Sequence, residues 1–73
     1  MSEFDPELFP QRLQQLRERR QISRKIMSEL CGLSKNMIAR YERGETEPTA
    51  STVAQIAEFF NVSTDYLLGE KKF

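Results

Sequence analysis

The segment from Ser23 to Gly44, SRKIMSELCGLSKNMIARYERG, constrains the fold more than any other part of this sequence. Gly32 divides it in two, and a glycine at positive φ commonly ends a helix. Apolar residues lie four apart before this glycine and three apart after it, as on the buried face of a helix, and one more fills the turn. These residues are Met27, Cys31, Leu33, Ile38 and Tyr41. The pattern predicts two short helices, joined by a turn, that share one small core.

The polar residues at the start of each half favour the same two helices. Ser23 and Ser34 are N-cap candidates, because a serine hydroxyl accepts hydrogen bonds from the first free amides of a helix. The helices are then expected over residues 24–31 and 35–43. Ser28, on the first of them, is small, and its hydroxyl can bond back to the carbonyl four residues earlier.

The rest of the chain also has helical spacing. A first helix is expected over residues 10–20, burying Leu13 and Leu16. Thr49 and Ser63 are N-cap candidates for two more helices, and the fourth helix carries one apolar stripe, formed by Val53, Ile56, Ala57 and Phe60. No segment alternates polar and apolar residues as a strand does. The fold is predicted to be all-α, with five helices.

These features together resemble the helix-turn-helix DNA-binding domains of the phage Cro and lambda-repressor type, often called the XRE family. The resemblance rests on the central segment and on flanking residues in matching order: Arg12-Leu13, Leu16-Arg17, Tyr41-Glu42-Arg43-Gly44, Glu47-Pro48-Thr49 and the stretch 61–69. It implies a compact lambda-repressor-like domain over residues 9–69. Residues 1–8 would then be an N-terminal arm and residues 70–73 a C-terminal tail.

Several positions depart from the family pattern: besides the two described below, Ser28 stands where the family commonly has alanine and Arg24 where it often has glutamine. Gln21 stands where the family usually has glycine at a positive φ, which costs a glutamine on the order of 1 kcal/mol. Either the turn differs here or the strain is tolerated. Ile26 stands where the family usually has an exposed acid, and with Leu30 it forms an apolar strip. This strip either packs against the N-terminal residues or binds a partner.

Composition excludes several classes of function. The 73 residues include one cysteine and no histidine, so neither an internal disulfide nor a zinc site of the usual ligands can form. A Ser-His nucleophile is excluded too, and no enzyme activity and no cofactor is expected. Cys31 is interpreted as a small buried residue, with a reactive thiol as the alternative. No apolar run is long enough to span a membrane, and a cytoplasmic location is expected.

The net charge is zero, but the charges are unevenly distributed. Between residues 12 and 43 there are nine basic residues and three acidic ones, an excess of six positive charges. The other eight acidic residues lie outside this range. Such polarity orients a domain on a polyanion without making the whole surface adhesive.

The resemblance also implies which residues contact DNA. In helix-turn-helix proteins the second helix of the motif lies in the major groove. The residues expected to read bases are Ser34, Lys35, Asn36 and Arg40. Arginine and lysine can pair with guanine and asparagine with adenine. Phosphate contacts are expected from Arg17, Arg24 and Arg43, and a partly buried ion pair is expected between Arg17 and Glu42.

The sequence therefore predicts a sequence-specific regulator of transcription that binds double-stranded DNA, most simply a phage-like repressor. One such domain covers little DNA, so a homodimer on a palindromic operator is expected. The alternative is a protein-interaction module of the same fold, similar to an antitoxin, that uses the strip of Ile26 and Leu30.

Overall fold

The computed structural model describes residues 8–69, and in this range the chain forms five α-helices and no strand. The helices are α1 (Leu8–Arg20), α2 (Arg24–Leu30), α3 (Met37–Glu42), α4 (Ala50–Phe60) and α5 (Thr64–Leu68). The predicted all-α fold is confirmed. The proposed tail 70–73 and residues 1–7 of the proposed arm lie outside the described range.

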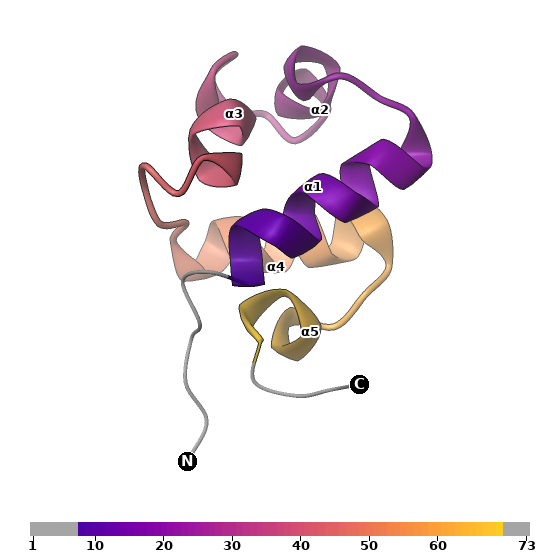
Figure 1. The fold of residues 1–73 in the computed structure, drawn as a ribbon, viewed down its shortest axis with the longest axis vertical. Coiled ribbons are helices and arrows are strands. Elements are labelled where there is room, and N and C mark those ends of the chain that lie inside the picture. The colour runs from indigo at the N-terminus through magenta and orange to yellow at the C-terminus, as the bar shows by residue number, and fades with distance from the viewer. Residues whose placement is uncertain (1–7, 70–73) are drawn as a thin grey trace.

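Helix α1 connects the two ends of the molecule. It packs against α3 on one side and α5 on the other, while α2 packs against α3 and α4 against α5. Figure 1 shows α2 and α3 together at one end and α5 at the opposite end. One core runs between them, built from Phe9, Leu13, Leu16, Met27, Cys31, Ile38, Tyr41, Val53, Ile56, Ala57, Phe60 and Leu67. The two-helix motif is thus held by the same core as the rest of the domain.

Three of the helices begin at the residues that the sequence predicts. The hydroxyls of Ser23, Thr49 and Ser63 accept hydrogen bonds from the amides of Ile26, Thr52 and Tyr66, at 3.0, 3.2 and 3.0 Å. Each bond satisfies an amide that has no partner within its own helix. These short bonds therefore fix where α2, α4 and α5 start.

Four helices end in the same backbone geometry. The first residue with positive φ donates to the carbonyl three residues back, and the next residue donates to the carbonyl five residues back, which is the Schellman arrangement. Gly32, Gly44 and Asn61 hold this position after α2, α3 and α4. Gln21 holds it after α1 with φ 58°. The turn is thus kept without glycine, and the strain at Gln21 is tolerated.

The first helix begins earlier than predicted. It starts at Leu8 rather than at residue 10, so Leu8 is helical and not part of an arm. Pro10 falls in the first turn, where its missing N–H removes no helical hydrogen bond. Phe9, 1% exposed, meets the Tyr41 ring edge-on with 5.8 Å between ring centroids. The two additional helical residues thereby add an aromatic contact between α1 and α3.

Candidate nucleic-acid interface

Ser28 joins the two helices of the motif. It is fully buried, and its Oγ accepts a hydrogen bond from the backbone amide of Ile38 at 3.3 Å. Ile38 is the second residue of α3, so its amide has no partner within that helix. Ser28 on α2 thus caps α3 from outside. From the sequence, this hydroxyl could bond within its own helix; in the structure it bonds to the neighbouring one.

The start of α3 differs from the prediction, because the side chain of Ser28 rather than that of Ser34 accepts from an amide in its first turn. Ser34 is not its N-cap; the helix begins at Met37, with Asn36 at the cap position. Among the described residues, no side-chain bond from Asn36 caps the helix. The Ser34 carbonyl accepts from the Met37 amide at 3.0 Å, which makes residues 34–37 a turn. The predicted helix 35–43 is therefore shorter at its start.

The four candidate base-reading residues are all exposed. Ser34, Lys35 and Asn36 lie in the turn before α3, and Arg40 lies on α3 itself. The Arg40 amide donates to the Asn36 carbonyl at 3.1 Å, so these two residues are one helical turn apart. Met37, in contrast, is half-buried against the core. The surface available to a ligand is thus the turn and the first part of α3.

Glu42 holds two arginines beneath this surface. Its side chain is 2% exposed, and its Oε2 lies 2.6 Å from Nε of Arg17. Its Oε1 accepts from Nη2 of Arg17 at 3.2 Å and from Nε of Arg24 at 2.9 Å. The ion pair expected between Arg17 and Glu42 is therefore present, with Arg24 as a further partner.

The two arginines on Glu42 differ in exposure. The Arg17 side chain is 11% exposed, and it also donates to the Ile22 carbonyl at 2.8 Å. This burial argues against the phosphate contact expected of Arg17 and gives it a structural role. The Arg24 side chain is 48% exposed and holds Glu42 through Nε alone. Nearly half of this side chain is therefore open to solvent and available to a further partner.

A second acidic residue, Glu45, pairs with Arg40 of α3 and with Arg43, which follows that helix. Its Oε2 lies 2.6 Å from Nε of Arg43, and its Oε1 lies 3.7 Å from Nε of Arg40. The hydrogen bond from Arg43 lowers the pKa of Glu45, and the same contact raises the pKa of Arg43. The sequence analysis did not single out Glu45. The signal was Gly44, because a Schellman turn brings the residue after it back toward the last helical turn.

Two of the nine basic residues counted above make contacts within the domain, with aromatic rings of the C-terminal helices. The guanidinium of Arg12 stacks on the Tyr66 ring, 4.5 Å from its centroid, and donates to the Tyr66 carbonyl. Arg20 lies 5.5 and 5.3 Å from the rings of Phe59 and Phe60. Both arginines join α1 to the C-terminal helices through cation–π contacts. The excess of positive charge at the motif is therefore smaller than the count along the sequence.

Helix α4 supports the end of α2. Nε2 of Gln55 donates to the Cys31 carbonyl at 2.6 Å, and this carbonyl lies where α2 ends. Cys31 itself is buried, and burial raises the pKa of its thiol. A protonated, covered sulfur is a poor nucleophile, which favours the structural interpretation of Cys31.

The apolar strip on α2 is open to solvent. Ile26 and Leu30 are 44% and 62% exposed. Within residues 8–69 they are the large hydrophobic residues that are exposed. Packing against residues 1–7 lies outside the described range. Within residues 8–69 the strip is not covered.

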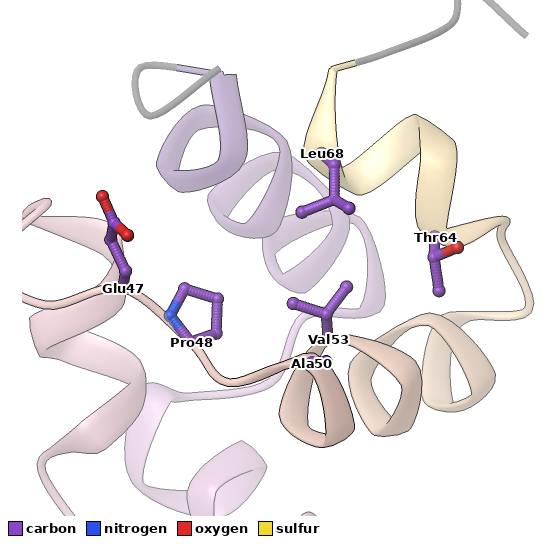
Figure 2. A pocket seen from close by; sticks show the side chains of 6 residues that line it. All are labelled: Glu47, Pro48, Ala50, Val53, Thr64 and Leu68. Carbon is purple, nitrogen blue, oxygen red and sulfur yellow. The ribbon is translucent and has the colours of Figure 1, made fainter. Parts of the chain in front are cut away.

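A pocket lies apart from the motif, between the loop before α4 and helix α5. Its volume is about 410 Å³, and its lining is mostly apolar. Figure 2 shows Val53 and Leu68 facing each other across it, with Glu47 and Pro48 at one side. Ala50 and Thr64 complete the lining. None of the residues expected to contact DNA lines this pocket.

Some kinds of site are missing from residues 8–69. No group of three or more potential metal ligands gathers there. Nor is any helix of that range both long and apolar enough to cross a membrane.

The motif, the core and the surface turn define a helix-turn-helix domain. The sequence profile of the helix-turn-helix family matches residues 13–67. The chain therefore belongs to the helix-turn-helix family of the XRE type.

Relatives and solved structures agree with this assignment. The chain is 34% identical over 59 residues to the HTH-type transcriptional regulator ImmR of Bacillus subtilis (strain 168), covering 81% of this chain and 46% of the relative. It is 34% identical over 61 residues to the regulator AnsR of the same organism, covering 84% and 53%. The chain thus spans about half the length of these relatives.

The P22 c2 repressor, solved in complex with synthetic operator 9T, has a similar structure. The TM-score is 0.81 at 28% identity, and the match covers 88% of this chain and 97% of that chain. The restriction-modification controller protein C.AhdI from Aeromonas hydrophila matches with a TM-score of 0.77 at 25% identity, covering 86% and 96%. The fold is that of the phage-repressor type.

Proposed function

We propose that this domain binds double-stranded DNA in a sequence-specific manner and regulates transcription as a repressor. The observation that carries the proposal is the exposed turn of Ser34, Lys35 and Asn36, with Arg40 one turn further along α3. The domain belongs to a family in which one similar structure is a repressor bound to an operator. Exposed cationic and amide groups at the start of the second helix are what base recognition requires.

In this proposal the turn and α3 enter the major groove together. Arg40 and Lys35 donate to guanine O6 and N7, and Asn36 pairs with adenine N6 and N7. Ser34 lies at the edge of the groove. Asn36 suits this role, because among residues 8–69 its side chain makes no capping bond that would have to break first.

Arg24 and Arg43 contact the phosphates on either side of α3. Arg24 can keep its hydrogen bond from Nε to Glu42 and present its terminal nitrogens to a DNA phosphate. Glu42 thereby orients the guanidinium of Arg24. A guanidinium that is already oriented loses less freedom when it binds phosphate. Arg17 supports this arrangement from below through the same carboxylate.

Two copies of the domain bind a palindromic operator as a homodimer. A single module of this kind covers about 600–1,000 Å² of protein surface, which is small for a specific complex. Two-fold symmetry doubles the contact and matches each α3 to one half-site.

The test compares two arginine variants on a site selected from a random duplex pool. Arg40→Ala should weaken binding to the selected site by about 1–3 kcal/mol and leave random duplex nearly unaffected, because Arg40 reads a base. Arg24→Ala should weaken binding to the selected site and to random duplex about equally. It should also reduce the slope of log affinity against log salt concentration by about one. Fluorescence anisotropy over a range of salt concentrations measures both. Equal losses on both duplexes for Arg40→Ala would refute its role in reading bases.

A second candidate function follows from the exposed strip on α2. Ile26 and Leu30 would suit an apolar partner, as in an antitoxin-like interaction module. A salt titration separates the two candidates: binding to random duplex that weakens steeply with salt supports DNA binding. Absence of any duplex binding at low salt would favour the interaction module.

A further inference from the structure

We propose that Ser28 is a positioning residue for base recognition, whose hydroxyl holds residues 34–36 in a turn and so sets how their side chains meet the bases. The inference rests on the proposed function, because Lys35 and Asn36 of this turn are two of the residues that would read bases. Ser28 is fully buried, so it would act on recognition through the backbone of α3 and not by contacting DNA.

Two oxygen atoms compete for the amide of Ile38, the second residue of α3. In a regular α-helix this amide would donate to the carbonyl four residues earlier, which is that of Ser34. In the structure it donates to Oγ of Ser28 at 3.3 Å. The Ser34 carbonyl accepts from the Met37 amide at 3.0 Å, only three residues ahead. The Ser28 hydroxyl thus takes the place of the Ser34 carbonyl as the acceptor.

Residues 34–36 consequently form a turn that precedes the helix. Asn36 has φ −101° and ψ 3°, which are not the angles of an α-helix. Lys35 and Asn36 are both exposed on this turn. Because the direction of each Cα–Cβ bond follows from the backbone angles, their side chains point elsewhere than they would from a helix beginning at residue 35. The backbone of the turn therefore decides which part of a groove each side chain reaches.

Burial makes the Ser28 hydroxyl hard to replace by water. Ser28 and Ile38 are both 0% exposed, so solvent does not reach the hydrogen bond between them. A buried amide without an acceptor costs more than its hydrogen bond contributes. If the hydroxyl is removed, the acceptor nearest along the chain is the Ser34 carbonyl, and Ser34 has the residue type of an N-cap. Loss of the hydroxyl therefore favours an α3 that begins at residue 35.

Such a change would move only part of the proposed base-reading surface. Arg40 lies within α3, and its amide already makes the helical bond to the Asn36 carbonyl at 3.1 Å, so its side chain keeps its direction. Lys35 and Asn36 precede the helix and would be redirected. A bidentate pair forms only when the polar edge of the side chain meets the edge of the base in the groove. Ser28 therefore controls the preference at bases read from the turn, and not at those read by Arg40.

The test is Ser28→Ala, with Ile56→Val as the matched control. Because Ser28→Ala should lower stability, the control must do the same without altering the motif. Ile56 is 0% exposed and lies on α4, where loss of one buried methylene group lowers stability modestly. Ser28→Cys is a second variant, since a thiol is a weaker acceptor than a hydroxyl but still fills the site. All variants are assayed at a temperature at which circular dichroism shows that they are folded.

Two measurements separate positioning from stability. The Cα chemical shifts of Lys35 and Asn36, measured by NMR on the free domain, report whether the turn is kept. Selection of bound sites from a random duplex pool reports the base preference. The same selection with Lys35→Ala, Asn36→Ala and Arg40→Ala assigns each base pair to the residue that reads it.

Ser28→Ala should move both chemical shifts toward helical values and change the selected bases at the pairs assigned to Lys35 and Asn36. Its affinity for the wild-type operator should fall about tenfold or more, as expected when one bidentate pair is lost. The preference assigned to Arg40 should be kept. Ser28→Cys should show the same changes to a smaller extent, and Ile56→Val should select the wild-type sequence.

Unchanged chemical shifts in Ser28→Ala would overturn the inference, and so would an unchanged base preference when the shifts have moved. Equal losses at every base pair, including those assigned to Arg40, would also overturn it, since lower stability alone would then explain them. So would two Ser28 variants that do not fold, because the hydroxyl would then serve the fold alone. A wild-type domain that selects no sequence would instead refute the proposed function, while the chemical shifts would still show whether Ser28 holds the turn.

Discussion

At the scale of single residues, a buried carboxylate needs cationic partners, and Glu42 has two. Its removal would leave the guanidinium of Arg17, which is 11% exposed, without its main partner. An uncompensated buried charge costs far more than a surface pair contributes. Glu42 and Glu45 are thus two acidic residues that pair with arginines in different surroundings, one buried and one exposed.

Glu42→Ala should therefore lower the free energy of unfolding by about 3–5 kcal/mol, as expected when one partner of a buried pair is deleted. Arg40→Ala, which removes an exposed side chain, should change it by less than about 0.5 kcal/mol. Urea denaturation followed by circular dichroism measures both. A loss below about 1 kcal/mol for Glu42→Ala would show that Arg17 finds water or another acceptor instead.

At the scale of helices, the end of α1 carries strain that a single substitution can remove. Gln21→Gly should raise the free energy of unfolding by up to about 1 kcal/mol, because glycine adopts φ 58° without a Cβ clash. Gln15→Gly, the same change at an exposed position inside α1, should lower it by about 1 kcal/mol. Thermal unfolding of the two variants checks the opposite signs. Two losses of similar size would mean that the turn at residue 21 is not strained.

The bond between α2 and α3 makes a second prediction about helices. Ser28→Ala should destabilise the domain by about 1–3 kcal/mol, because the buried amide of Ile38 loses its acceptor. Ser51→Ala, on the exposed side of α4, should stay within about 0.5 kcal/mol of wild type. Denaturant titration of both variants provides the comparison. A near-neutral Ser28→Ala would indicate that water replaces the hydroxyl.

Most helix boundaries could be predicted because their causes are local. Ser23, Thr49 and Ser63 cap amides only three residues ahead, and such bonds depend on residue type and spacing alone. The start of α3 could not be predicted in the same way. Its cap comes from Ser28, ten residues away on another helix, and only the packing of the two helices brings them together.

The candidate interface shows the same limit. Its exposed residues follow from the family pattern, and all four candidate base-reading residues are at the surface. The pair of Arg17 with Glu42 also followed from it, but the other partners of the arginines did not. Glu42 recruits Arg24, and Glu45 meets Arg40 and Arg43, through contacts that depend on how a turn and two helices lie in space.

At the scale of the whole molecule, the proposal of a homodimer predicts how binding depends on operator length. Two domains should occupy a palindrome whose half-sites lie about 34–36 Å apart, one turn of DNA. A duplex with one half-site should bind far more weakly, because one module covers too little surface. Titration with light-scattering detection gives the number of domains per duplex. Equal affinity for full and half sites would contradict dimeric binding.

The hydrogen bond from Gln55 to the Cys31 carbonyl predicts how the helix-turn-helix segment would behave as an isolated peptide. A synthetic peptide spanning residues 23–44 would contain every side chain proposed to contact the operator. It would lack Gln55 and Arg17, which hold its first helix and its buried acid from outside. Helices of six and seven residues do not persist in water by themselves. Such a fragment should therefore fail to bind the operator specifically, although its amino-acid sequence is unchanged.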